Sequence, residues 1–527
     1  MPEAPVFAFL GRLNRVAHKM GPVRVRVLAL SLIVIVGLAL RLMTLTRASL
    51  WLDEGFTLFF ASHTLEVIFG QLARTDPNSP LYILIVKAWT GLFGTSTFAV
   101  RLLPALVSAC TAPLIYLAVK KAAPGGRGYR EGLLAALMFE LCFYQLHLGQ
   151  ELRAYAFLIF NCAGSIAMAT CIIRAEQNPE GQPPTLKVRG IHAAGLGFFM
   201  AGAVWSHYTS LAFLAILGSG MALWWLFVTR RSVRVFWQLA LAAILFFLAS
   251  AMAFSFILTV SQTVMPTFWL TARSIEQVVE TTTLLFGAAF DVLNWKLDVL
   301  VRIALFAIWP VLGIRLIFTT PDSATRWCLS LFVALSIGFW AVMLILTYTV
   351  QPIFMNRTLS PIQIGWIGLS AIGVWHLPQA RVRHYGVAAI IAVWALGALS
   401  YELKKPSAIY SEDWRQMARL VAQESTPDDV VGVMSIGGYI MDYYSTRLGE
   451  PQAFQAICLP ELTLSNSQIL DAGQHARALA AALDAGQLDW VIIRDDAERE
   501  VITRELTARG YMEPTYITER LAAYRID

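Results

Sequence analysis

The sequence predicts a polytopic α-helical membrane protein with a small α/β domain at its C-terminus. Of 527 residues, 57% are hydrophobic and only 14% are charged, whereas soluble domains carry about 25% charged residues. Apolar runs of about 20 residues, enough to cross a bilayer as a helix, recur between residues 27 and 402. Beyond residue 402 these runs stop, and short helical and strand patterns alternate instead.

About eleven segments have the length and apolar character of a membrane span. They are 27–45, 99–119, 132–149, 152–173, 191–206, 209–229, 236–260, 299–319, 327–349, 358–376 and 386–402. The segment 80–93 is also apolar, but it is short and Lys87 interrupts it. We therefore expect a re-entrant or interfacial helix there.

Lysine and arginine residues cluster in short loops that follow every second span. Because cytoplasmic loops are enriched in these residues, this pattern predicts a cytoplasmic N-terminus (1–26), a transmembrane domain (27–402) whose first loop (46–98) is extracytoplasmic, and an extracytoplasmic C-terminal domain (403–527). The run 27–45 is too long for a signal peptide and lacks a cleavage site, so we expect it to be retained. The protein is thus predicted to be a multi-pass protein of the cell (inner or plasma) membrane. The same clusters account for the formal charge of +6, so no nucleic-acid partner is expected.

The C-terminal domain begins after the linker at Lys404-Lys405-Pro406. Helices are predicted at 412–424 and 471–483, and strands at 430–433 and 490–493. This alternation indicates an α/β domain. The sequence of this domain lacks a phosphate-binding glycine motif. Two further helices are expected in the outer loops, near 64–74 and 272–286.

Two neighbouring carboxylates, Asp53 and Glu54, follow the first span within Ser49-Leu50-Trp51-Leu52-Asp53-Glu54-Gly55. They are open to a simple interpretation, in which they only end a membrane helix at the water interface. Ionised groups beside a bilayer are costly, however, and are usually functional or paired. Adjacent acids repel, which would raise the pKa of at least one if both are poorly hydrated. Neighbours in a helix point about 100° apart, so we expect different roles for the two.

Acidic, basic and aromatic residues gather on the predicted outer face. The candidates are Trp51, Asp53, Glu54, Asp76, Tyr82, Lys87, Glu151, Arg153, Tyr155, His207, Tyr208, Asn356 and Arg357. Singly, each has a structural explanation: His207 as a helix-end residue in an aromatic belt, Arg357 reaching from a helix end to the interface, and Glu151 pairing with Arg153. Their common location favours a site.

These residue types suit transfer of a sugar from a lipid phosphate. A carboxylate acts as general base on an acceptor hydroxyl, and arginine holds a phosphate leaving group through charge-assisted hydrogen bonds. Aromatic faces stack on sugar rings, for which Trp51, Tyr82, Tyr155 and Tyr208 are candidates.

Several motifs resemble the C-fold (GT-C) glycosyltransferases, in particular protein O-mannosyltransferases and the lipid A aminoarabinose transferase. They are Trp51-Leu52-Asp53-Glu54, Asp76-Pro77-Asn78-Ser79-Pro80-Leu81-Tyr82, Phe93-Gly94 and Val100-Arg101-Leu102-Leu103-Pro104-Ala105. Gln150-Glu151-Leu152-Arg153-Ala154-Tyr155 and Ser206-His207-Tyr208 resemble later motifs of their bacterial relatives. The likeness covers residues 40–210 well, and beyond that it rests on the span count, Arg357 and the C-terminal domain.

The resemblance implies inverting transfer of a sugar from a polyprenyl-phosphate donor to a lipid, glycan or protein acceptor on the outer face. It implies Asp53 as the base and Glu151 as the acid of the second loop. Arg153 and Arg357, with Lys87 or His207, are expected to stabilise the departing phosphate. Asn78-Ser79-Pro80 stands where relatives often have His-Pro-Pro, which puts metal dependence in doubt, and we predict no metal or other cofactor.

Two other functions fit part of the same pattern. A transporter or flippase for a lipid-linked saccharide would use a similar charged site, although no internal repeat typical of transporters is found. A noncatalytic relative would use the C-terminal domain to bind a partner. The presence of Asp53 together with Arg153 and Arg357 favours the enzyme.

Overall fold

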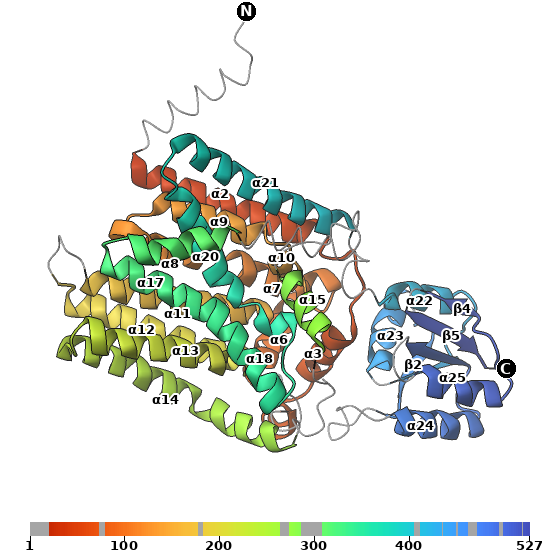
Figure 1. The fold of residues 1–527 in the computed structure, drawn as a ribbon. Helices are drawn as coiled ribbons and strands as arrows, with labels where there is room; N and C mark the ends of the chain where they lie inside the picture. The colour runs from red at the N-terminus through yellow and green to blue at the C-terminus, as the bar shows by residue number, and fades with distance from the viewer. Residues whose placement is uncertain are drawn as a thin grey trace, which may run out of the picture.

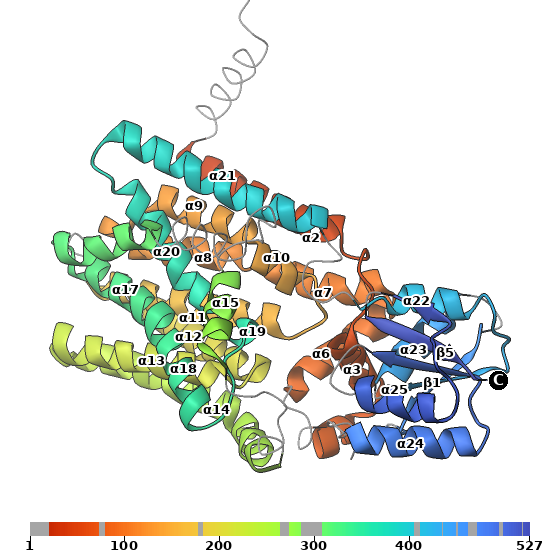
Figure 2. The same ribbon diagram turned by 45° about the vertical axis from the view of Figure 1, so that its right-hand side comes forward.

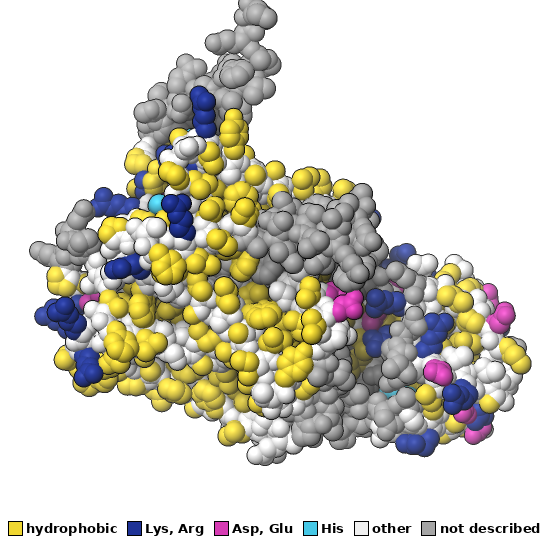
Figure 3. Space-filling view, in the orientation of Figure 1, with side chains coloured by type: hydrophobic (Ala, Val, Ile, Leu, Met, Phe, Trp, Pro, Cys, Tyr) yellow, Lys and Arg dark blue, Asp and Glu magenta, His cyan; other side chains and the backbone are white. Residues whose placement is uncertain are grey.

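A body of long apolar helices carries a smaller α/β domain at one end (Figure 1). The structure is a computed structural model, and it describes residues 21–72, 79–177, 183–263, 273–285, 308–404, 412–434, 436–448, 452–461, 472–494, 499–518 and 520–526. The candidate Asp76 and part of the predicted linker lie outside these residues. In the space-filling view, hydrophobic side chains cover the helical body between a basic end and the charged C-terminal domain (Figure 3).

The long helices of the body follow most of the predicted spans. They are α2 (Pro22–Met43), α7 (Thr97–Ala109), α8 (Ala112–Ala122), α9 (Tyr129–Glu140), α10 (Phe143–Gly149), α11 (Tyr155–Glu176), α12 (Leu186–Ser206), α13 (Ser210–Leu223) with η3 (Trp224–Val228), α14 (Val233–Thr263), α17 (Ser323–Val333) with η5 (Ala334–Gly338) and α18 (Phe339–Thr349), α20 (Ile362–Trp375) and α21 (Ala380–Lys404). Shorter helices are α3 (Leu52–Ser62), α4 (Leu65–Val67) with η1 (Ile68–Leu72), α6 (Pro80–Phe93), α15 (Ile275–Leu284) and α19 (Asn356–Leu359).

Seven stretches among the described residues are long and apolar enough to cross a membrane, and the bent pair α9–α10 makes an eighth if it is one span. Three apolar helices are shorter: α6, Ile308–Thr319 and α20. A multi-pass membrane protein is therefore confirmed. The total of about eleven spans stays a prediction.

The predicted span 132–149 is not one straight helix, because α9 and α10 meet at an angle of 61°. The reason lies in the polar residues of α10. Gln145 is hydrogen-bonded to Gln363 on α20, and Nδ1 of His147 lies 3.2 Å from the hydroxyl of Tyr401 on α21. Buried polar groups require such partners, and the bend turns α10 toward the helices that supply them.

The C-terminal domain is a five-stranded sheet with helices, as the alternating pattern predicted. Its strands are β1 (Val430–Met434), β2 (Gln455–Leu459), β3 (Trp490–Arg494), β4 (Tyr516–Ile517) and β5 (Leu521–Arg525), in the order β2-β1-β3-β5-β4. β1 runs parallel to β2 and β3, whereas β5 runs antiparallel to β3 and β4. The helices are α22 (Trp414–Val421), α23 (Gly437–Ser445), α24 (Ala472–Asp484) and α25 (Arg499–Ala508).

The sheet domain is docked on α3, the short helix that begins with Trp51-Leu52-Asp53-Glu54 (Figure 2). Gly55 allows this approach, since a Cβ atom there would lie only 2.6 Å from Cγ1 of Ile440 on α23. The amide of Leu50 donates a hydrogen bond of 2.7 Å to the hydroxyl of Tyr444. One hydrophobic cluster includes residues of α3, α6, α22, α23 and the sheet, so the domain packs on α3 through a shared core.

Candidate active site

The site is built around the first turn of α3. Asp53 and Glu54 both lie in this turn, where the positive end of the helix dipole stabilises negative charge. The Glu54 carboxylate also accepts a hydrogen bond of 3.2 Å from the amide of Trp51, the residue that precedes the helix. The sequence therefore places both acids by ordinary helix capping, and their partners differ.

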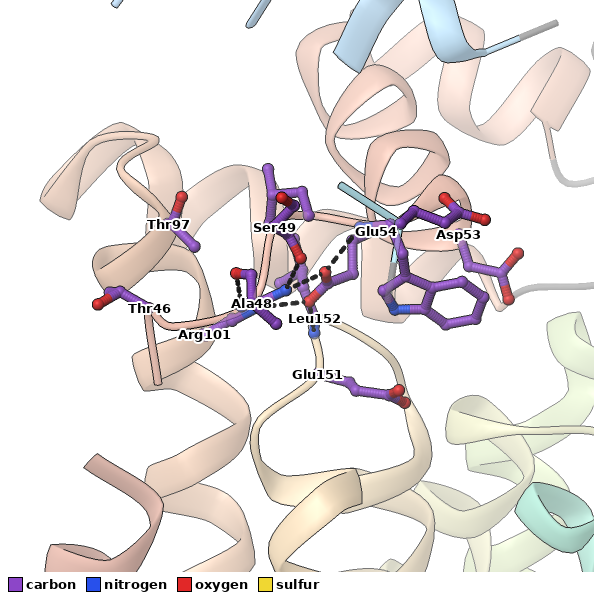
Figure 4. Close-up of polar contacts among 12 residues, drawn as sticks. Thr46, Ala48, Ser49, Asp53, Glu54, Thr97, Arg101, Glu151 and Leu152 are labelled. Carbon is purple, nitrogen blue, oxygen red and sulfur yellow. Dashed lines mark hydrogen bonds and ion pairs between the residues drawn. The ribbon is translucent and has the colours of Figure 1, made fainter. Parts of the chain in front are cut away.

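Glu54 belongs to a fully buried network with Arg101 of α7 (Figure 4). Nε of Arg101 donates to Oε1 of Glu54 at 2.8 Å, and Nη2 donates to Oε2. The amide of Leu152 also donates to Oε1, at 2.8 Å. The Arg101 guanidinium further bonds the carbonyls of Leu45, Ala48 and Ser49. These contacts tie the end of the first span, α3, α7 and the second loop together.

Asp53 points away from this network to two other arginines. Its Oδ2 lies 2.8 Å from Nη1 of Arg357 on α19 and 3.6 Å from Nη2 of Arg153. Nη1 of Arg153 also donates to the Asp53 carbonyl and to Thr57. The Asp53 side chain remains 29% exposed, and its Oδ1 accepts no hydrogen bond within the part of the chain that the structure describes. One oxygen is therefore held, and the other is open to a ligand.

The two arginines determine the charge state of Asp53. Burial raises the pKa of this carboxyl, but the opposing effect of Arg153 and Arg357 is larger, and the pKa falls below its usual value. The expectation that repulsion between adjacent acids raises a pKa is thus wrong for Asp53, because each acid faces its own cations. Asp53 is ionised at neutral pH.

Arg357 is held between aromatic rings. Its guanidinium carbon lies 5.1 Å from the ring centre of Trp51 and 5.7 Å from that of Tyr155, and the His207 ring lies 5.4 Å beyond Tyr155. Burial and the nearby arginines lower the pKa of His207 to about 4. His207 is therefore neutral at neutral pH and carries no positive charge with which to hold a phosphate.

Glu151 lies in the loop between α10 and α11, with its carboxylate outside the Glu54 network (Figure 4). Its Oε1 is 3.0 Å from Nε2 of His147, one helical turn earlier in the sequence. Its Oε2 is buried and has no hydrogen-bond partner among the described residues. The structural alternative in which Glu151 pairs with Arg153 is not observed, since Arg153 faces Asp53. Burial raises the pKa of Glu151, but His147 and Arg357 together lower it below its usual value.

The remaining candidates lie around this centre. Tyr82 on α6 is buried, with its ring 5.5 Å from that of Phe157. Nζ of Lys87 donates to the carbonyl of Ala61 near the end of α3, and no contact in the described structure brings it to Asp53. Tyr208 is half-buried in the turn between α12 and α13. Substrate binding by any of these residues remains a prediction.

Sequence reasoning missed the residues that support the site from other elements. Glu412, from the C-terminal domain, accepts hydrogen bonds from the amide of Leu52 at 2.9 Å and from the Trp414 indole, and it pairs with Arg494 at 2.8 Å. The signal was present in Glu412-Asp413-Trp414, a second pair of acids beside a tryptophan. His147 stands four residues before Glu151, a helical spacing that also pointed to a pair.

Groups of three or more histidine, cysteine, aspartate or glutamate side chains that could hold a metal ion are absent from the described residues. With Asp76 outside those residues, the expectation that the protein needs no metal stays untested.

The fold resembles that of solved structures of ArnT and of an archaeal oligosaccharyltransferase, in agreement with the fold that the motifs predicted. No family model and no curated protein matches the sequence.

Solved structures do match. The ArnT structure from Cupriavidus metallidurans bound to undecaprenyl phosphate has a TM-score of 0.60 at 12% identity, covering 94% of this chain and 97% of ArnT. The apo form of the same protein gives a TM-score of 0.60 at 13% identity. The Archaeoglobus fulgidus oligosaccharyltransferase in its apo form has a TM-score of 0.52 at 11% identity, covering 92% of this chain and 71% of that one. At these identities the likeness establishes the fold.

Proposed function

We propose that this protein is an inverting glycosyltransferase that moves a sugar from a polyprenyl-phosphate donor to an acceptor hydroxyl at the extracytoplasmic face. The observation that carries the proposal is the environment of Asp53. An ionised carboxylate with one open oxygen stands between two arginines, at the end of the helical body where the C-terminal domain docks. Undecaprenyl phosphate bound to the ArnT structure of similar fold supports the donor class.

In the proposed reaction, Asp53 takes the proton of the acceptor hydroxyl as the oxygen attacks the anomeric carbon. The bond from that carbon to the phosphate oxygen breaks on the opposite face, which inverts the configuration. Arg153 and Arg357 hold the phosphate as its charge grows, because guanidinium groups match phosphate geometry and are preorganised here by Thr57, Trp51 and Tyr155.

We expect donor binding also to raise the pKa of Asp53, the proposed base. In the free site, Arg153 and Arg357 lower the pKa of Asp53, which makes it a weak base. A phosphate that shares these guanidinium groups reduces their effect on Asp53 and so strengthens the base. Asp53 is then most basic when the donor is in place, which disfavours activation of an acceptor without a donor.

An apolar groove between two helices that contact α19 suits the lipid part of the donor. It has a volume of about 720 Å³ and is lined by Ile275, Val278, Val279, Thr282, Thr283, Trp340, Leu344 and Tyr348, from α15 and α18. Both of these helices contact α19, which carries Arg357. A phosphate at Arg357 with its chain along α15 and α18 is consistent with this arrangement.

The test is sugar transfer by protein reconstituted in lipid, with a panel of polyprenyl-phosphate sugars and crude membrane and cell-wall acceptors. We expect transfer from one donor, release of polyprenyl phosphate and an inverted anomeric configuration in the product. Asp53→Asn should lower the rate about a hundredfold or more, within the range of general-base loss, whereas Asp484→Asn on the surface of the C-terminal domain should not. Translocation of a lipid-linked saccharide without transfer, equal in wild type and Asp53→Asn, would contradict the proposal and favour a transporter.

A further inference from the structure

The turn between α13–η3 and α14 has a strained backbone at two arginines. Arg230 has a φ of 52° and Arg231 a φ of 61°, and among the described residues no other residue except glycine has a positive φ. In this left-handed conformation the Cβ atom comes close to the following carbonyl oxygen, which is unfavourable for every residue except glycine and, to a lesser degree, asparagine and aspartate. Two consecutive arginines therefore stand where glycine would fold with less strain, and the proposed mechanism gives them no role.

The turn lies at the membrane surface, because it joins two spans directly. Ser210–Val228 and Val233–Gln262 are both long and apolar enough to cross a bilayer, and only the four residues 229–232 separate them. The first of these helices begins just after His207 of the active site, and 19 residues of helix extend over about 28 Å. The turn is therefore on the opposite face of the membrane from the active site, at the end of the helical body away from the C-terminal domain (Figure 1).

Contacts from both helices hold the turn in this conformation. The indole N–H of Trp225 donates a hydrogen bond of 3.0 Å to the carbonyl of Ser232, and the amide of Arg231 donates one of 3.0 Å to the carbonyl of Trp225. The Trp225 ring also lies 5.5 Å from the ring of Phe236 on α14. The arginines of the turn therefore extend from a fixed backbone and not from a flexible loop.

Within the described part of the chain, the arginine side chains around this turn have no partner. Arg230, Arg231 and Arg234 are exposed, and no hydrogen bond, ion pair or ring contact to another described residue holds their guanidinium groups. Arg189 differs, because it pairs with Glu176 at 2.7 Å beside the beginning of α14, whose Gln238 donates to the Arg189 carbonyl. Three positive charges within five residues are thus left to a ligand or to water.

We propose that this turn binds the headgroup of an anionic phospholipid in the leaflet opposite to the active site. Guanidinium groups match the geometry of phosphate with paired N–H donors, and basic clusters at headgroup level attract anionic lipids. Phe227 and Trp237, on the two helices beside the turn, are 70% and 65% exposed and offer apolar surface to the acyl chains below the headgroup. The site is separate from the active site and does not depend on the proposed function.

Orientation of the protein in the membrane explains the charge of this turn but not its backbone. Basic residues keep a loop on the cytoplasmic side in any backbone conformation, and an arginine beside a left-handed glycine would serve that purpose equally well. Successive left-handed conformations at Arg230 and Arg231 instead fix where both guanidinium groups begin. Strain that surrounding contacts maintain is typical of functional sites, and a bound headgroup accounts for both the charge and the strain.

The test measures binding of phosphatidylglycerol to the full chain in neutral detergent by native mass spectrometry, with thermal unfolding of the same samples. The double variant Arg230→Asn with Arg231→Asn removes two charges and keeps residues that tolerate the left-handed conformation. We expect its affinity for phosphatidylglycerol to fall about tenfold or more, while its unfolding temperature without lipid equals or exceeds that of wild type. Phosphatidylglycerol should raise the unfolding temperature of wild type much more than that of the double variant.

The matched control is Arg326→Gln with Arg381→Gln, which removes two exposed arginines from other basic loops of the same predicted face. This control should bind phosphatidylglycerol as wild type does. Equal loss of affinity in the two double variants would show that total charge attracts the lipid, and it would overturn the site.

Two further measurements separate the remaining outcomes. Arg234→Gln, in the regular helix α14, should weaken phosphatidylglycerol binding even if the double variant at the turn fails to fold, and wild-type affinity in Arg234→Gln together with wild-type affinity in a folded turn variant would overturn the proposal. Inorganic phosphate should raise the unfolding temperature of wild type much less than phosphatidylglycerol does. An equal rise with inorganic phosphate would assign the turn to a free anion and contradict the lipid site.

Discussion

Asp53 and Glu54 are adjacent in the sequence, carry the same charge and begin the same helix, yet they have opposite environments. Both oxygens of Glu54 are occupied by Arg101 and backbone amides in a fully buried network. Asp53 has one oxygen held by two arginines, and its other oxygen accepts no hydrogen bond from the described residues. A carboxylate whose bonding capacity is filled by the protein holds structure, and one left partly open is available for chemistry. The two acids are therefore distinguished by how many of their carboxylate oxygens the protein already binds, and not by their residue type.

The largest expected effect is on stability, at the filled carboxylate. Glu54→Gln leaves the Arg101 guanidinium buried without a counter-charge, and breaking a buried pair in this way costs about 3–5 kcal/mol. Thermal unfolding in detergent should therefore shift to clearly lower temperature.

The matched control for that shift is Glu500→Gln, which removes an exposed pair with Arg504 and should leave the midpoint nearly unchanged. If Glu54→Gln unfolds at the same temperature as Glu500→Gln, the structural role of Glu54 is wrong.

A smaller effect, confined to activity, is expected at Arg357. The substitution Arg357→Lys keeps the positive charge at this position. It removes the planar guanidinium group that lies near the rings of Trp51 and Tyr155 and contacts Asp53. We expect transfer to fall about tenfold to a hundredfold through loss of phosphate positioning, with thermal unfolding little changed. Arg504→Lys, at an exposed pair in the C-terminal domain, should retain full activity. Wild-type transfer in Arg357→Lys would show that charge alone is needed.

The C-terminal domain should affect the rate through Glu412. Glu412→Gln weakens the bonds to the amide of Leu52 and to Arg494, beside the residue that carries the base. We expect a decrease in kcat of up to about tenfold, from a small displacement of the base, with KM for the donor nearly constant. Glu505→Gln on α25 provides the control. A change in donor KM with unchanged kcat would instead assign Glu412 to binding.

The smallest effect is a pH dependence of stability at His207. Because its pKa is lowered to about 4 in the folded protein and is about 6.5 when unfolded, the unfolded state binds more protons between these values. Its contribution makes stability fall as pH decreases from about 6.5 toward 4. His207→Gln should flatten this part of the curve in urea unfolding at a series of pH values. An unchanged slope would mean that His207 is not buried in its neutral form.

Much of this arrangement could be predicted from local sequence. Apolar runs identified the spans, and Trp51-Leu52-Asp53-Glu54 identified the helix start with its two acids. The sequence also placed Arg153 and Arg357 on the same face as Asp53, although Asp53 and Arg357 are 304 residues apart.

What could not be predicted are the pairings, because they depend on distant elements. Nothing local assigns Arg101 to Glu54 or Glu412 to the amide of Leu52. The bend between α9 and α10 has the same origin, since it serves partners on α20 and α21. The strands β2, β4 and β5 escaped prediction because short strands of a small sheet depend on their neighbours more than on intrinsic preference.

The account is tested most directly by the transfer rate per folded molecule of Asp53→Asn and Glu54→Gln, measured side by side with the unfolding temperature of each. We predict that Asp53→Asn loses about a hundredfold or more of the rate at a nearly unchanged unfolding temperature. Glu54→Gln should unfold much earlier but transfer at close to the wild-type rate in the molecules that remain folded. The reverse result, with the rate lost in folded Glu54→Gln and kept in Asp53→Asn, would contradict the assignment of both carboxylates.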